Sequence, residues 1–119
     1  MSLIPDPLKQ QMQENGKTNW ALSAKDENTV DYRPVVKLFN PCGAATWLLT
    51  ELDPEDADLA FGLCDLGMGS PELGSVRISE MEDYKGPLGI GIERDIHFEA
   101  DKTLSEYADE ARIHQRIIA

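Results

Sequence analysis

Three side chains could perform acid–base chemistry together if the fold brought them into one site. His97 is the best candidate for a general base, because an unperturbed imidazole titrates close to neutral pH. Asp65 or Glu99 could orient the imidazole, and Arg94 would be the only cation of the site. An enzyme or ligand-binding domain with a polar site at Asp65, Arg94 and His97 is therefore one hypothesis, although no spacing in the sequence links the three residues.

Metal and phosphate sites are not predicted. The acidic segment 53–58 begins like a calcium-binding loop, but the twelfth position holds no glutamate and Asp58 stands where the turn glycine is needed. His97 and His114 have no second ligand at the spacing of a zinc site. The glycine-rich segments 67–69 and 86–91 lack the Gly-Lys-Ser/Thr of a phosphate-binding loop. The sequence predicts no metal and no cofactor.

The charge of the chain is strongly one-sided. Its 119 residues include 22 acidic and 11 basic side chains, which gives a formal net charge of −11. Residues 1–50 hold five acids and five bases, so the whole excess lies in residues 51–119. A surface of this sign repels nucleic acids and anionic lipids, and it favours a protein partner with a basic surface. The simpler alternative is an acidic surface that only keeps the protein in solution.

The sequence shows neither a signal peptide nor a membrane-spanning segment. The first residues lack the apolar core of a signal peptide, and no apolar stretch approaches the roughly 20 residues that span a membrane. We therefore expect a cytoplasmic protein without membrane contact.

Two cysteines, Cys42 and Cys64, do not form a disulfide framework, and both are expected to be small buried apolar residues.

Residues 34–98 have the pattern of a β-meander, in which short apolar or alternating runs are separated by turn residues. Strands are predicted over residues 34–39, 45–52, 59–66, 73–78 and 92–98. Short turns between consecutive strands favour antiparallel pairing. The acidic segment 53–58 is expected to be a connection between the second and third strands.

Helices are expected at both ends of the chain and in one connection. The pattern predicts a helix over residues 5–14 that stops at Gly16, followed by a loop-like segment over residues 17–33. The pairs Ser79–Glu82 and Thr103–Glu106 have the spacing of a capping box and predict helices over about 79–85 and 103–117.

These elements predict a single domain over residues 1–119, of the α+β class. It is an antiparallel meander of four to five strands with an N-terminal helix, a short connecting helix and a C-terminal helix packed on the sheet.

Several segments carry a resemblance to a known family. They are residues 34–39 (PVVKLF), 45–53 (ATWLLTELD), 61–65 (FGLCD), 72–74 (ELG), 86–89 (GPLG) and 92–95 (IERD). Through them, roughly residues 3–112 resemble an uncharacterised bacterial family labelled domain of unknown function 2958. The resemblance implies no activity. It implies a setting on plasmids, phages and integrative elements, near antirestriction and DNA-processing genes.

Charge and resemblance together favour a small acidic protein-binding module from a mobile genetic element, which modulates a nucleic-acid-handling host system through its acidic surface. The residues expected to contact the partner are Glu51, Asp53, Glu55, Asp56, Asp58, Glu80, Glu82 and Asp83. Two alternatives stay open: the polar site named above, and a structural domain that self-associates through an exposed sheet edge or Trp20.

Overall fold

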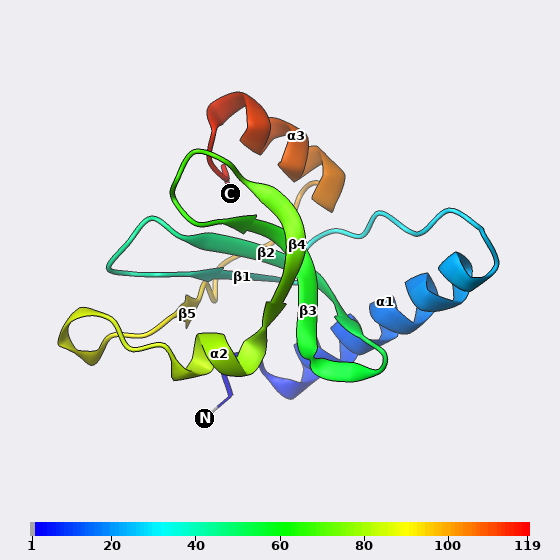
Figure 1. Ribbon diagram of the computed structural model, residues 1–119, viewed down its shortest axis with the longest axis horizontal. Helices are drawn as coiled ribbons and strands as arrows, with labels where there is room; N and C mark the ends of the chain where they lie inside the picture. The colour runs from blue at the N-terminus through cyan, green and yellow to red at the C-terminus, as the bar shows by residue number, and fades with distance from the viewer. Residues whose placement is uncertain (1) are drawn as a thin grey trace.

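Five strands joined mostly by short turns form an antiparallel sheet at the centre of the molecule (Figure 1). The structure is a computed structural model that describes residues 2–119. The strands are β1 (Val36–Phe39), β2 (Thr46–Asp53), β3 (Asp56–Asp65), β4 (Glu72–Arg77) and β5 (Glu93–Arg94), and their spatial order is β4-β3-β2-β1-β5. The helices are α1 (Asp6–Ala24), α2 (Ile78–Asp83) and α3 (Leu104–His114), with a 3-10 turn, η1, at Pro87–Gly89. The predicted α+β class and antiparallel meander are confirmed.

A hydrophobic core lies on each face of the sheet. Side chains on β2 alternate between these two cores, because successive residues of a strand point to opposite faces. Trp47 and Leu49 join the core that also contains Met12 of α1 and Met81 of α2. Leu48, between them, joins the opposite core, which α3 covers with its buried stripe of Leu104, Tyr107, Ala108 and Ala111. The expected packing of the C-terminal helix on the sheet is confirmed.

Helix α1 is longer than the sequence pattern indicates. It runs through Gly16 to Ala24, so the prediction of a loop over residues 17–33 is wrong for its first eight residues. Gly16 does not end the helix but brings it against the sheet, since a Cβ there would lie only 1.8 Å from the Leu52 carbonyl oxygen. A glycine signals close backbone approach as readily as a helix end, and here the packing role applies.

The β2 strand contains a bulge that the sequence does not reveal. Thr50 is inserted between the pairs Leu49↔Gly62 and Glu51↔Phe61. β2 also extends past the first residue of β1, and α1 packs against this extension. Asn15 of α1 donates to the Thr50 carbonyl at 2.9 Å, so a helix side chain satisfies a strand group that has no strand partner.

Several predicted boundaries need correction. The segment 53–58 is not a long connection. β2 ends at Asp53 and β3 begins at Asp56, so only a tight turn lies between them. Only Glu93–Arg94 of the predicted strand 92–98 pairs with β1. The capping box at Thr103 is confirmed, since Thr103 N donates to Glu106 Oε1 at 2.9 Å. The helix ends at His114, before a left-handed residue (φ 58°) at Gln115.

Neither cysteine is fully buried. Cys42 is exposed in the β1–β2 turn and Cys64 is partly buried, so the expectation that both are buried is wrong. Cys42 lies among turn residues, where no core is available to cover it.

Across residues 2–119, no helix combines the length and the apolar character needed to cross a membrane.

Candidate functional site: an apolar groove beside an open sheet edge

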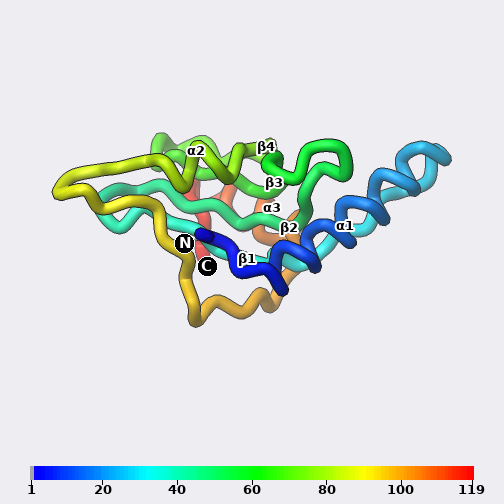
Figure 2. The backbone as a smooth tube through the Cα atoms, turned by 90° about the horizontal axis from the view of Figure 1, so that it is seen from below, coloured from blue at the N-terminus to red at the C-terminus, as the bar shows by residue number. Residues whose placement is uncertain are grey.

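β4 forms one edge of the sheet and is exposed along most of its length. It pairs with β3 in an unbroken register of six residue pairs, from Leu59↔Arg77 to Cys64↔Glu72. Figure 2 shows β4 along the outer margin of the molecule, while the chain after α2 runs out and returns at the other side of the sheet. Unpaired backbone groups on such an edge can bond to another strand.

Gly74, in the middle of β4, faces open space. A Cβ added to Gly74 would meet no atom within 4 Å, and the residue does not need a left-handed backbone. Neither packing within the chain nor backbone conformation therefore requires a glycine at this position. A glycine within a strand is typical of places where a ligand or another backbone approaches closely.

A groove of about 590 Å³ lies beside β4 and α2. Its apolar lining comes from several elements and includes Trp47, Leu59, Val76, Met81, Tyr84 and Ile92. Trp47 is 8% exposed and belongs to the core, while Tyr84 is 40% exposed at the margin. The Tyr84 hydroxyl accepts a long hydrogen bond from Asn40 Nδ2, at 3.4 Å. The groove can hold apolar side chains that approach along β4.

Acidic residues outnumber basic ones along β4 and α2. Between residues 72 and 85 the chain carries four acids, Glu72, Glu80, Glu82 and Asp83, and two bases, Arg77 and Lys85. Glu80 and Arg77 both line the groove, but Arg77 is already paired with two carboxylates. The net field at the groove therefore favours a positively charged ligand.

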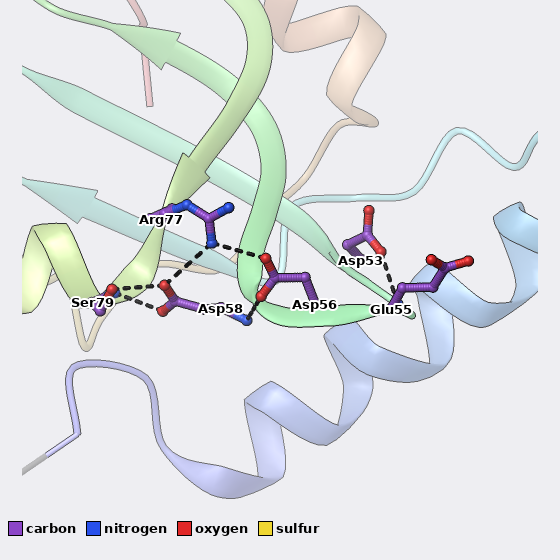
Figure 3. A network of polar contacts seen from close by, with 6 residues as sticks. All are labelled: Asp53, Glu55, Asp56, Asp58, Arg77 and Ser79. Atoms are coloured by element: carbon purple, nitrogen blue, oxygen red, sulfur yellow. Dashed lines mark hydrogen bonds and ion pairs between the residues drawn. The ribbon is translucent and has the colours of Figure 1, made fainter.

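A network of polar contacts fixes the end of β4 to β3 and α2 (Figure 3). Arg77 Nη1 donates to Asp56 Oδ2 at 2.8 Å and lies 3.7 Å from Asp58 Oδ2. Asp58 accepts from the Ser79 backbone N–H at 2.8 Å and from the Ser79 hydroxyl at 2.7 Å. The predicted capping box at Ser79 is therefore wrong, because Asp58 on the neighbouring strand takes these donors at the start of α2.

These contacts set the ionisation of the two aspartates. The hydrogen bond from Arg77, followed by that from the Asp58 backbone N–H, lowers the pKa of Asp56. The bonds from the Ser79 side chain and backbone lower the pKa of Asp58. Both carboxylates therefore stay ionised to lower pH than a free aspartate, and as anions they accept the hydrogen bonds that join β3 to β4 and α2.

The eight acidic residues expected to contact a partner fall into two groups. Some have structural contacts: Asp56 and Asp58 in this network, Asp53 with Glu55 N at 2.8 Å, Glu82 with Leu3 N at 2.7 Å, and Glu51 with Asn19 Nδ2 at 3.0 Å. The side chains of Glu55, Glu80 and Asp83 are exposed. Charge alone could not separate these groups, because most of these partners lie far away in the sequence.

In the part of the chain that the structure describes, residues 2–119, the three residues of the predicted polar site have separate surroundings. Asp65 is 3% exposed, and its oxygens accept from Gly67 N at 2.8 Å and Ile117 N at 3.0 Å. Arg94 lines a cavity beside the N-terminal segment. His97 lines a different cavity near α3, together with Glu99. His97 and Glu99 therefore line one cavity, whereas the carboxylate of Asp65 is used to bond the backbone at Gly67 and Ile117.

Fold and site together define a small α+β protein whose antiparallel sheet has an open edge next to an apolar groove. The chain belongs to the family described as Protein of unknown function (DUF2958), whose model matches residues 3–118. Comparison with curated proteins and with solved structures gave no match.

Proposed function

We propose that this protein is a binding module that holds an extended, basic segment of a partner protein along β4. The observation that carries the proposal is the combination of an open, regular edge strand with a groove of about 590 Å³ beside it. An added strand gains affinity from main-chain hydrogen bonds, and pockets for alternate side chains give it specificity.

The apolar groove provides the second part of this recognition. In an added strand, side chains alternate between the two faces, so every second residue points the same way. Apolar residues at these positions would enter the groove against Trp47, Met81 and Tyr84. Gly74 leaves the space that such a neighbour needs.

Charge supplies the selectivity for a basic partner. Glu80 lines the groove, Glu72 on β4 and Asp83 at the end of α2 are exposed, and the chain as a whole carries a net charge of −11. Lysine or arginine residues at the ends of the segment, next to the apolar ones, would lie near these carboxylates. Segments of this composition are typical of surfaces that contact phosphates. Nucleic-acid-handling proteins are accordingly the partner class, in keeping with the mobile-element setting that the family resemblance implies.

A second copy of the chain is a weaker occupant for the same edge. Pairing β4 with another β4 would bring the exposed acids Glu72, Glu80 and Asp83 of two copies together. Like charges across an interface oppose association. Sedimentation of the free protein separates the two occupants. A dimer that Gly74→Lys abolishes would assign the edge to self-association and overturn the proposal.

The binding test uses a capped peptide of about eight residues in which lysine alternates with valine or phenylalanine. Calorimetry at low salt should give a dissociation constant of roughly 10 µM, which should weaken at least about tenfold in about 0.5 M NaCl. The control peptide carries glutamate in place of lysine and should not bind. Equal affinity for the two peptides would contradict the proposal.

A pair of charge reversals locates the site. Glu80→Lys changes the rim of the groove, whereas Glu14→Lys makes the same change at an exposed position of α1, away from β4. Only Glu80→Lys should weaken peptide binding by about tenfold. An equal loss in both variants would indicate attraction to net charge alone. Reversal of Asp56 or Asp58 is avoided because both also make contacts within the chain, with Arg77 and Ser79.

A further inference from the structure

A second cavity, of about 300 Å³, lies between the C-terminal half of α1 and the β2–β3 hairpin. In Figure 1 this part of α1 runs beside the hairpin. The helix contributes Asn19 and Trp20, β2 contributes Glu51 and Asp53, and β3 contributes Phe61. The cavity shares Leu59 and Ser75 with the groove beside β4, but its lining has a different chemistry.

Glu51 occupies a fixed position in this cavity. It pairs with Phe61, which pairs with Ser75, so the three residues form a row across β2, β3 and β4. Asn19 Nδ2 donates to Glu51 Oε2 at 3.0 Å. Asn19 is itself held by hydrogen bonds with both the N–H and the carbonyl of Val30, at 2.7 and 3.1 Å.

The carboxylate of Glu51 is incompletely solvated and incompletely bonded. Burial raises the pKa of Glu51, and the bond from Asn19 only partly offsets this effect. Among residues 2–119, Asn19 is the one hydrogen-bond donor to this carboxylate, and its Oε1 is open to solvent or a ligand rather than buried without a partner. An ionised carboxylate in such a place gains from a cation that bonds to its free oxygen.

The remaining walls suit the body of an organic cation. Trp20, 50% exposed, lines the cavity, and Phe61, which also packs against the core under α3, forms part of the wall. Glu51 and Asp53 are the charged residues of the lining, and none of the lining residues is lysine or arginine. Aromatic faces and carboxylates together attract alkylammonium and guanidinium groups.

We infer that the Glu51 cavity binds an organic cation, with an alkylguanidinium or alkylammonium head on Glu51 and its alkyl chain against Trp20 and Phe61. The cation can come from a free amine or from an arginine or lysine side chain of another protein. The inference does not depend on strand addition at β4, because a small cation can enter this cavity while β4 remains unpaired.

The first experiment follows fluorescence of the Trp47→Phe variant, in which Trp20 is the single tryptophan. Titration with n-butylguanidinium should give a saturable signal with a dissociation constant of about 1 mM. The uncharged analogue n-butylurea has a similar shape and should give no saturable signal. The wild-type protein, followed by calorimetry, provides the same comparison in case the variant folds poorly.

Substitution of the carboxylate tests the assignment to Glu51. Glu51→Gln keeps the size of the side chain and should weaken n-butylguanidinium binding about tenfold. The matched variant Glu27→Gln removes a charge at an exposed position outside the cavity and should leave affinity unchanged. Circular dichroism checks that both variants keep the fold.

A capped arginine tripeptide distinguishes the two sources of the cation. Tighter binding of the tripeptide than of n-butylguanidinium would indicate that the cavity takes a side chain of a protein. Equal or weaker binding would indicate a free amine. The inference is overturned if n-butylurea binds as well as n-butylguanidinium, if Glu51→Gln binds normally, or if no saturable binding occurs.

Discussion

Gly62 and Gly74 face each other across β3 and β4, yet they stand in different surroundings. A Cβ at Gly62 would lie 2.0 Å from the Leu48 carbonyl oxygen, whereas a Cβ at Gly74 would meet nothing within 4 Å. The chain itself therefore explains the glycine inside the sheet but not the one at its edge. β3 is therefore closed by its neighbours, while β4 is open to another chain.

The largest expected effect separates these two glycines by stability. Gly62→Ala forces its Cβ against backbone atoms and should reduce the free energy of unfolding by about 3 kcal/mol or more. Gly74→Ala should leave stability unchanged or raise it by about 0.5 kcal/mol, because alanine loses less backbone entropy. Urea unfolding of both variants measures the difference. Similar losses at the two positions would remove the contrast.

The next effect concerns binding at the open edge. Gly74→Val puts a branched side chain on one face of β4, where it would crowd the facing side chain of an added strand, and should weaken the alternating lysine peptide about tenfold while the protein stays folded. Ser70→Val, in the exposed turn before β4, adds a side chain of the same size and should leave affinity unchanged. Calorimetry with the same peptide compares the two. Unchanged affinity in Gly74→Val would mean that the peptide does not approach this part of β4.

A smaller effect is expected where the network of Figure 3 anchors the end of β4. Asp58→Ala removes the acceptor for both Ser79 donors and should lower Tm by a few degrees at neutral pH. The Ser79 bonds hold the pKa of Asp58 below its ordinary 3.8, so the stabilisation is complete above that pH. It is lost as pH falls through the lowered pKa. Thermal unfolding of both proteins from pH 7 down to pH 2 should show the Tm difference shrinking, whereas a constant difference would contradict the assignment.

The smallest effect has the opposite sign and concerns Glu51. Burial raises the pKa of Glu51 above its ordinary 4.5, so its ionisation destabilises the folded protein at neutral pH. Glu51→Gln should therefore raise stability at pH 7, by less than about 1 kcal/mol because the side chain remains partly solvated. The gain should disappear below pH 4.5, where the folded and unfolded wild-type chains both hold the proton. A loss of stability at pH 7 would show that the bond to Asn19 outweighs burial.

The sheet could be predicted largely from the sequence because its strands carry local signals. Alternating apolar residues and turn residues located β1 to β4, and the stripe with Leu104 and Tyr107 identified α3. Gly16 was misleading because a glycine has the same local meaning at a helix end and at a close contact. The bulge at Thr50 depends on how β2 pairs, so residues on β2 alone could not reveal it.

The candidate site could not be predicted in the same way. The groove is assembled from the β1–β2 turn, β2, β3, β4, α2 and the segment before β5, and no short pattern joins these parts. Glu80 was among the predicted contact residues, but Trp47 and Tyr84 were not. The open space at Gly74 is visible only once the neighbours of β4 are known.

Hydrogen exchange of backbone amides tests the central claim, strand addition at β4, most directly. With the alternating lysine peptide bound, amides within Glu72–Arg77 should exchange more slowly, while those of Glu93–Arg94 at the other edge should not change. This result would place the peptide on β4. Unchanged exchange in Glu72–Arg77 at saturating peptide, or equal protection at both edges, would show that the peptide does not add to β4.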